Sequence, residues 1–360
     1  MRDNFDIVAE LESRPDLIEY PGELLMKGGP KDYIGAALCI RATLYFKGAH
    51  LQQVRDHIVS CFEEFGRLSG DVFSWLWRES ATDDCPKLPY KNSKPLGDYI
   101  ESMSENEHLS FYYTGGSRAE DASSWQFRIY GQRGWKAKVG RDTSVVEFSV
   151  PVVFFEGRRP DFIALVVKCA RWLKAEHGYA GYALNLSPVR REKNEPIEAF
   201  LSERMPGMDV GNAPLLADRP EFKPFKIKTV SWLTVINYAR LDLVGGAEGI
   251  QDKLPAGYFR MYDYGAGVVI QAGAKPSALG DQKDLRPAAY ILLDHQLSDI
   301  RLFNVGSLHS NSQRGEIRLT GWAADRWLQR FDVRPSEIRN HVERLMQESP
   351  ITGEDALKTT

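Results

Sequence analysis

The chain has 360 residues, of which 43% are hydrophobic and 26% are charged, a composition typical of a globular protein long enough to divide into domains. No stretch approaches the roughly 20 apolar residues that cross a bilayer, and the N-terminal segment lacks the apolar region of a signal peptide, so we expect a cytoplasmic protein without a membrane partner. The net charge of −3 disfavours direct nucleic-acid binding, because nucleic-acid-binding proteins usually carry a basic face.

Hydrophobic periodicity divides the first half of the chain into strands and helices. Residues 36–46 alternate as a strand does, and from 51 to 65 the apolar residues recur every three or four positions, as in an amphipathic helix. A proline-containing loop region follows. Beyond it we expect two strands, a central strand broken near Pro151, a helix closed by His177-Gly178, and one more strand. These segments are, in order, 109–113, 125–131, 145–155, 162–173 and 182–187.

The second half begins after a segment rich in proline and aspartate, 206–224, which is typical of a connection. The expected elements are then a strand at 230–236, a partly helical stretch at 237–254, a hairpin formed by 258–264 and 267–272, a helix at 285–297, and an amphipathic helix at 334–347.

A strand, a helix, a hairpin and a helix thus occur twice in roughly the same order. We therefore predict an α+β fold of two packed lobes with mainly antiparallel sheets and a possible internal pseudo-repeat. The predicted divisions are an N-terminal arm (1–35), a first lobe (36–205), a connection (206–226), a second lobe (227–332), and a C-terminal helix with a tail (333–360).

No motif for a metal or a cofactor is present. Four cysteines (Cys39, Cys61, Cys85 and Cys169) lie far apart without a CxxC pair, and three of them sit in apolar runs as buried thiols do. The histidines lack zinc-helix spacing. The glycine-rich stretch 265–273 falls in the expected hairpin, where a phosphate-binding loop cannot form. We predict no cofactor, no metal site and no catalytic residue.

The most enzyme-like group is formed by Asp281, Asp284, Asp294 and His295. Asp281 and Asp284 precede the expected helix, where carboxylates cap free amides and interact favourably with the helix dipole. Capping is therefore the favoured interpretation. A metal or acid–base site is the alternative.

An acidic, aromatic-rich stretch at 79–121 carries nine acidic against four basic residues, a net of −5. It is either a solvated loop face or a patch that steers a basic partner. Tryptophan and tyrosine are frequent binding hot spots, and those left exposed beside the acids are candidate interface anchors. The candidate partner-binding residues are Asp83, Asp84, Glu101, Glu105, Glu107, Tyr112, Tyr113, Glu120, Asp121 and Trp125.

Eight strings in order carry a resemblance to a known family. They are LYFKG at 44–48, FSWLW at 73–77, LSFYYTGG at 109–116, WQFRIYGQRGW at 125–135, HGYAGYALNLSP at 177–188, VSWLTVINYARLDLVGG at 230–246, GVVIQAGAKPSALGD at 267–281, and GWAADRWLQRFD at 321–332. Together they resemble the type VI secretion immunity family over roughly 36–332.

The resemblance implies a protein that binds and neutralises a cognate secreted effector toxin, without a catalytic motif of its own. Since the chain is expected in the cytoplasm, the toxin is expected to act there, for example as a nuclease. Two alternatives stay open: an enzyme that reverses or degrades a toxin product, and a non-catalytic module of the secretion apparatus. The sequence does not indicate an oligomeric state.

Overall fold

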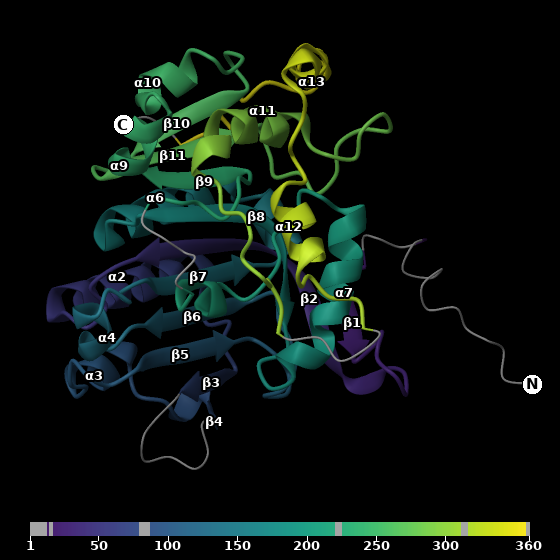
Figure 1. Ribbon diagram of the computed structural model, residues 1–360. Coiled ribbons are helices and arrows are strands. Elements are labelled where there is room, and N and C mark those ends of the chain that lie inside the picture. The colour runs from purple at the N-terminus through teal and green to yellow at the C-terminus, as the bar shows by residue number, and fades with distance from the viewer. Residues whose placement is uncertain (1–12, 14–16, 79–86, 220–224, 311–315, 358–360) are drawn as a thin grey trace, which may run out of the picture.

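One eleven-stranded antiparallel sheet forms the centre of the computed structural model, which describes residues 13, 17–78, 87–219, 225–310 and 316–357 (Figure 1). The strand order is β10-β11-β9-β8-β2-β7-β6-β5-β3-β4, and β1 also pairs with β2. The strands are β1 (Glu19–Gly22), β2 (Lys31–Phe46), β3 (Trp75–Arg78), β4 (Lys87–Pro89), β5 (Leu109–Thr114), β6 (Gln126–Gly131), β7 (Ser144–Val150), β8 (His177–Leu186), β9 (Leu233–Asn237), β10 (Phe259–Asp263) and β11 (Gly267–Ala272).

Helices surround this sheet. They are α2 (Gln52–Ser69), α3 (Leu96–Glu101), α4 (Gly134–Lys138), α5 (Val152–Glu156), α6 (Arg159–Leu173), α7 (Arg191–Arg204), α8 (Ala213–Ala217), α9 (Tyr238–Leu241), α10 (Gly246–Gln251), α11 (Ala288–Leu297), α12 (Trp322–Leu328) and α13 (Ile338–Leu345). Within the described ranges, no helix is both long and apolar enough to cross a membrane.

Two apolar layers lie on opposite faces of the long central strand β2. Side chains such as Leu44 pack with α2 and α6, and we call this side the α6 face. On the other side Tyr45 packs with residues of α7, α8 and α12, and we call this side the α7 face. Side chains on both faces of β2 therefore meet apolar partners, which explains why β2 is buried from Gly35 to Phe46.

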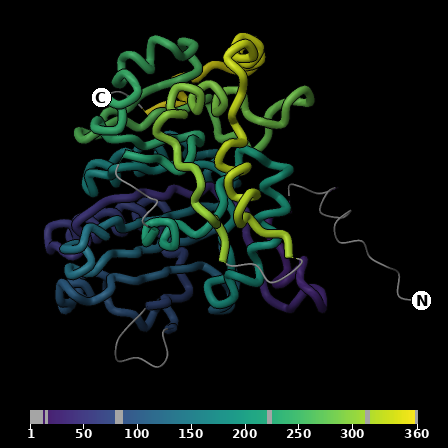
Figure 2. The backbone as a smooth tube through the Cα atoms, viewed as in Figure 1, coloured from purple at the N-terminus to yellow at the C-terminus, as the bar shows by residue number. Residues whose placement is uncertain are grey.

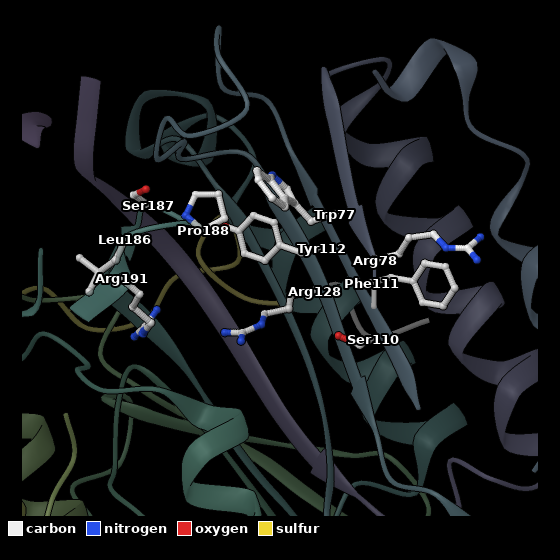
Figure 3. A pocket seen from close by; sticks show the side chains of 10 residues that line it. All are labelled: Trp77, Arg78, Ser110, Phe111, Tyr112, Arg128, Leu186, Ser187, Pro188 and Arg191. Atoms are coloured by element: carbon white, nitrogen blue, oxygen red, sulfur yellow. The ribbon is translucent and has the colours of Figure 1, made fainter. Parts of the chain in front are cut away.

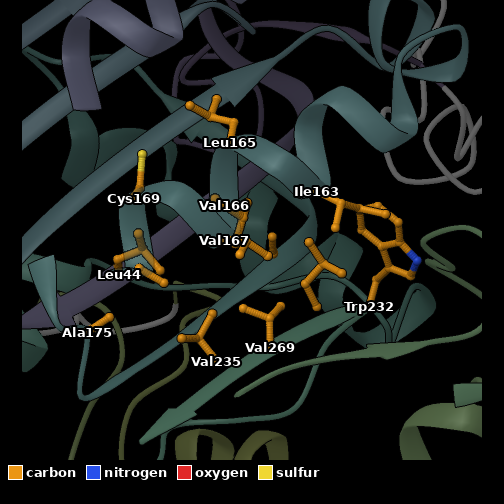
Figure 4. Close-up of a cluster of buried hydrophobic side chains, with 14 of the residues drawn as sticks. Leu44, Ile163, Leu165, Val166, Val167, Cys169, Ala175, Trp232, Val235 and Val269 are labelled. Atoms are coloured by element: carbon orange, nitrogen blue, oxygen red, sulfur yellow. The ribbon is translucent and has the colours of Figure 1, made fainter. Parts of the chain in front are cut away.

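The core of the α6 face extends across both predicted lobes. Figure 4 shows Val166 and Val167 of α6 lying close to Val235 of β9 and Val269 of β11. The β8–β9 pairing, which sets His177 opposite Ile236, joins the two halves into one sheet. Figure 2 also shows the C-terminal part of the chain, in yellow, running back along the molecule beside the α7 segment.

The predicted α+β class and the antiparallel pairing are confirmed, and the internal repeat is not confirmed. The division into lobes stays a prediction. The expected strand at 145–155 is wrong beyond Pro151, since this proline ends β7 and α5 follows. The predicted helix closure at His177-Gly178 is also wrong. Helix α6 ends at Leu173 because Lys174 adopts a left-handed conformation (φ 47°), and His177 already belongs to β8.

The buried thiols expected from the sequence are present. Cys39, Cys61 and Cys169 are free and buried, as the apolar runs around them predict. Cys85 lies outside the described residues.

Candidate functional site

A row of side chains crosses the α7 face from one strand to the next. Directly paired positions are, in order across the sheet, Trp77, Tyr112, Arg128, Glu147, Thr43 and Tyr179. Helices α7 and α8 pack over β2, β8 and β7, so Glu147, Thr43 and Tyr179 are buried. Trp77, Tyr112 and Arg128 remain partly exposed at the other end of the row.

A pocket of about 260 Å³ lies at this partly exposed end, between the strands and the β8–α7 connection. It is lined by Trp77, Arg78, Ser110, Phe111, Tyr112, Arg128, Leu186, Ser187, Pro188 and Arg191. In Figure 3, Trp77, Tyr112 and Arg128 extend toward Pro188 and Arg191, whereas Arg78 and Phe111 point to the other side of the strands. We call this site the Arg128–Arg191 pocket.

Arg128 is held in place but is only partly neutralised. Its Nη1 donates to Glu147 Oε2 at 3.4 Å and to Asn212 Oδ1 at 3.2 Å, and its guanidinium lies 5.9 Å from the Tyr112 ring centroid. Burial lowers the pKa of Arg128; the Glu147 carboxylate opposes this effect, while the positive charge of Arg191 adds to it. The two guanidinium groups therefore repel each other across the pocket.

Arg191, the first residue of α7, has fewer partners. Its Nη2 donates to the Gly211 carbonyl oxygen at 2.8 Å, and its buried Nε has no hydrogen-bond partner among the described residues. No carboxylate in the described part of the chain lies within ion-pair distance of Arg191. Its charge does contribute to lowering the pKa of Glu198, deeper in the protein. The pocket thus carries an excess of positive charge.

The covered half of the α7 face also carries charges, but these are paired. Asp209 accepts from Arg41 Nη2 at 2.8 Å and from Lys228 Nζ at 2.6 Å. Burial alone would raise the pKa of Asp209, but Lys228 and Arg41 hold it below its usual value. Nearby, His309 Nε2 lies 2.7 Å from Glu198 Oε2. These pairs connect β2, α7 and the segment before α12.

The predicted acidic patch is divided by the fold. Glu101, Glu105 and Glu107 are exposed on α3 and the loop before β5, whereas Glu120 and Asp121 follow the opposite end of β5. Glu105 lies 3.9 Å from Lys138 Nζ, and Glu107 accepts from the Ser104 N–H at 2.8 Å. Asp83 and Asp84 lie outside the described residues.

Glu120 is half-buried and borders a second pocket next to Trp77. Asp121 is 3% exposed and accepts hydrogen bonds from the Ile34 and Arg118 N–H groups at 3.0 and 2.9 Å. Asp121 is therefore both hydrogen-bonded and buried, whereas the acids before β5 are exposed.

The predicted aromatic anchors also differ in exposure. Tyr112 lines the Arg128–Arg191 pocket, but its neighbour Tyr113 points to the α6 face and is only 1% exposed. Trp125 is half-buried, with its ring centroid 4.7 Å from that of Phe154. The exposure that an anchor requires is thus absent at Tyr113. Successive strand residues face opposite sides of a sheet, which separates Tyr113 from Tyr112.

The three carboxylates of the enzyme-like cluster are each paired with an arginine. Asp281 accepts from Arg344, which lowers the Asp281 pKa to about 2, and Asp284 pairs with Arg286. Asp294 pairs with Arg301. Burial raises the pKa of the Asp294 carboxyl to about 6, although Arg301 opposes this effect. His295 lies beside Asp294 on α11 and is half-buried.

Within the described residues, no group of three or more histidine, cysteine or carboxylate side chains could hold a metal ion. The predicted helix capping by Asp281 and Asp284 is wrong, because α11 begins only at Ala288 and has no side-chain cap. Asp281 instead accepts from the Lys283 and Asp284 N–H groups, and Asp284 from the Arg286 N–H, so both carboxylates stabilise the turn before the helix.

Three residues of the pocket, Trp77, Arg128 and Arg191, were not among the predicted site residues. The alternation in WLWR and QFRIYG is a signal that Trp77 and Arg128 lie on strands. It does not show that the start of α7 completes the pocket.

Comparison with known families matches residues 57–331 to the family described as TsiV, type VI immunity for VRR-NUC. Among solved structures, the chain is similar to the Pseudomonas aeruginosa T6SS protein PA0821, with 51% sequence identity, a TM-score of 0.95, and 99% of each chain covered. The search of curated proteins gives no match. The matched range includes every residue of the Arg128–Arg191 pocket.

Proposed function

The chain belongs to the family described as type VI immunity for VRR-NUC, and from this premise we propose that it neutralises a nuclease-type type VI effector by binding it. The match over residues 57–331 is the observation that carries the proposal. The pocket adds physical support, because tryptophan, tyrosine and arginine are the residue types that dominate protein–protein hot spots.

Neutralisation proceeds by stoichiometric binding in this proposal, not by catalysis. The ion pairs of Asp281, Asp284 and Asp294 with arginines support this part, since they give each carboxylate a role in the fold. The complex forms in the cytoplasm, where a nuclease would meet nucleic acid. An interface of standard size, about 1,600 Å² in total, is sufficient for a stable complex.

The exposed acids Glu101, Glu105 and Glu107, together with Glu120, contribute to the contact in this proposal by attracting a basic surface of the effector. Exposed charges act mainly on the rate of association. Their exposure supports this role for the three acids on α3 and before β5.

The test is co-expression with the product of the adjacent gene, followed by titration of its nuclease activity with purified immunity protein. We expect restored growth, co-purification at a fixed ratio, and inhibition that is complete at that same ratio. Protection at far lower ratios would support an enzyme that acts on the toxin or its product. Failure of the two proteins to associate under conditions that preserve both folds would contradict the proposal.

A further inference from the structure

We infer that the Arg128–Arg191 pocket receives a carboxylate side chain of the effector, bound between the two guanidinium groups and against the rings of Trp77 and Tyr112. This inference rests on the proposed function and specifies the chemistry of the partner group. The aspartate or glutamate would supply the negative charge that the pocket itself lacks.

The charge balance of the lining gives the first argument. Three of the ten lining residues are arginines, and no lining residue among those described is acidic. Arg78 points away, which leaves Arg128 and Arg191 directed at the pocket (Figure 3). The carboxylate nearest to Arg128 is Glu147, which also lies 3.8 Å from Arg41 Nε and therefore serves two arginines.

The incomplete hydrogen bonding of Arg191 gives the second argument. Of its three guanidinium nitrogens, only Nη2 has a hydrogen-bond partner in the described part of the chain. The Arg191 Nε–H group is buried, and a buried donor without a hydrogen-bond partner is costly. An entering carboxylate would offer two acceptor oxygens, and arginine–carboxylate hydrogen bonds are among the strongest in proteins.

The aromatic walls are fixed before a partner arrives. The Trp77 Nε1–H donates to the Ala119 carbonyl oxygen at 3.0 Å, and the Tyr112 hydroxyl donates to Gln126 Oε1 at 2.9 Å. Both rings therefore present apolar surface to the methylene groups of an incoming side chain. Such pre-organisation reduces the entropy cost of binding.

The size and surroundings of the pocket favour a protein carboxylate over nucleic acid. Its volume of about 260 Å³ suits one side chain and part of its backbone. The adjoining pocket beyond Trp77 sets the acids Asp32 and Glu120 among the bases Lys31, Lys87 and Arg190, so the positive charge does not continue from the Arg128–Arg191 pocket as an unbroken basic groove for a run of phosphates. The net charge of the chain, −3, also disfavours nucleic acid as the partner.

The first test compares Arg191→Ala with Arg171→Ala, a control on the exposed surface of α6 on the opposite face of the sheet. The binding partner is the product of the adjacent gene, immobilised as a catalytically inactive protein. We expect Arg191→Ala to weaken affinity at least 30-fold, mainly through faster dissociation, because it removes one partner of a buried charged pair. Arg171→Ala should bind like the wild type.

A second variant keeps every existing hydrogen bond of the two arginines. Ser110 lines the pocket, and Ser110→Glu would place a carboxylate of this chain inside it. We expect unchanged or increased thermal stability, because the new carboxylate offsets the excess positive charge. We also expect effector affinity to fall at least 30-fold, since the site is then occupied.

A charge-reversal scan identifies the partner group. Surface aspartates and glutamates of the effector, changed singly to lysine, are tested against Arg191→Glu, and one of them should restore binding. A fluorescent DNA oligonucleotide serves as the second probe and should not bind the wild type.

The outcomes separate the two proposals. If the wild type binds no effector, the proposed function fails. If the wild type binds but Arg191→Ala and Ser110→Glu, both folded, bind equally well, only the pocket inference fails. Oligonucleotide binding that Arg191→Ala abolishes would assign the pocket to phosphate and overturn the carboxylate inference.

Discussion

The two halves of the α7 face lie along one cross-strand row, but their charged side chains are paired to different extents. In the covered half, Asp209 lies between Arg41 and Lys228, so buried cations meet a buried carboxylate. In the open half, Arg128 and Arg191 face each other with no carboxylate in the pocket lining that the structure describes. Buried charge therefore stabilises the fold where it is paired internally, and it is available to a partner where it is not.

The largest expected effect is a loss of stability and concerns the covered half. Asp209→Ala would leave Arg41 and Lys228 buried without their shared carboxylate. We expect the free energy of unfolding to fall by about 3–5 kcal/mol, as when one partner of a buried ion pair is removed. Urea denaturation measures this change. A loss below about 1 kcal/mol would mean that water solvates these cations and that the two halves do not differ in burial.

A smaller effect concerns pH and also belongs to the covered half. His177 accepts from the Lys228 N–H through Nε2 at 3.0 Å, and burial, with a contribution from Arg240, lowers its pKa to about 3. Because the pKa in the folded state lies below that of the unfolded chain, the unfolded chain binds the proton first. The stability that neutral His177 provides is present above about pH 6.5 and is lost as the pH falls toward 3.

Between pH 7 and pH 5 this site should remove about 2 kcal/mol of stability. His177→Gln keeps an acceptor for the Lys228 N–H but cannot titrate. Between pH 7 and pH 5, the unfolding free energy of this variant should therefore fall by about 2 kcal/mol less than that of the wild type. Urea denaturation across this range measures the unfolding free energy of the wild type and of His177→Gln. If both depend equally on pH, His177 does not titrate as its burial requires.

The sequence predicted β5 and β6 of the open half, but it predicted neither β3, which carries Trp77, nor the site itself. Alternation places Tyr112 and Tyr113 on opposite faces of β5, but it does not show which face is covered. Helix α7 was missed because its buried side includes Asn194 and Glu198, and because Pro196 lies inside it. Amphipathic periodicity depends on an apolar buried stripe, and this helix buries polar groups that find partners elsewhere in the fold.

The sequence did not indicate the candidate site for a related reason. Arg128 and Arg191 lie far apart in the sequence and line one pocket only because the start of α7 lies beside β5 and β6. The acidic stretch shows the reverse case. Glu107 and Glu120 are near each other in the sequence, yet they lie at opposite ends of β5. Sequence proximity is thus a poor guide to a surface patch when a strand lies between the residues.

The smallest expected effect concerns these acids. Changing Glu105 and Glu107 together to lysine should slow association with the effector by about threefold to tenfold at low salt and weaken its salt dependence, with little change in dissociation. The control is Glu63→Lys on the exposed surface of α2, on the α6 face. If the rate and its salt dependence match the control, the loop before β5 is only a solvated surface.

Photo-crosslinking tests most directly whether the open half is the effector-binding surface. Val189 is 47% exposed, lines the second pocket with Trp77, and follows Pro188 of the Arg128–Arg191 pocket. Val153 on α5 is 77% exposed, and α5 packs against α6. Each is replaced by p-benzoylphenylalanine, and the complex with the effector is irradiated. We expect a covalent adduct with the effector from position 189 and none from 153. An adduct from 153, with none from 189 in a complex that still forms, would contradict this expectation.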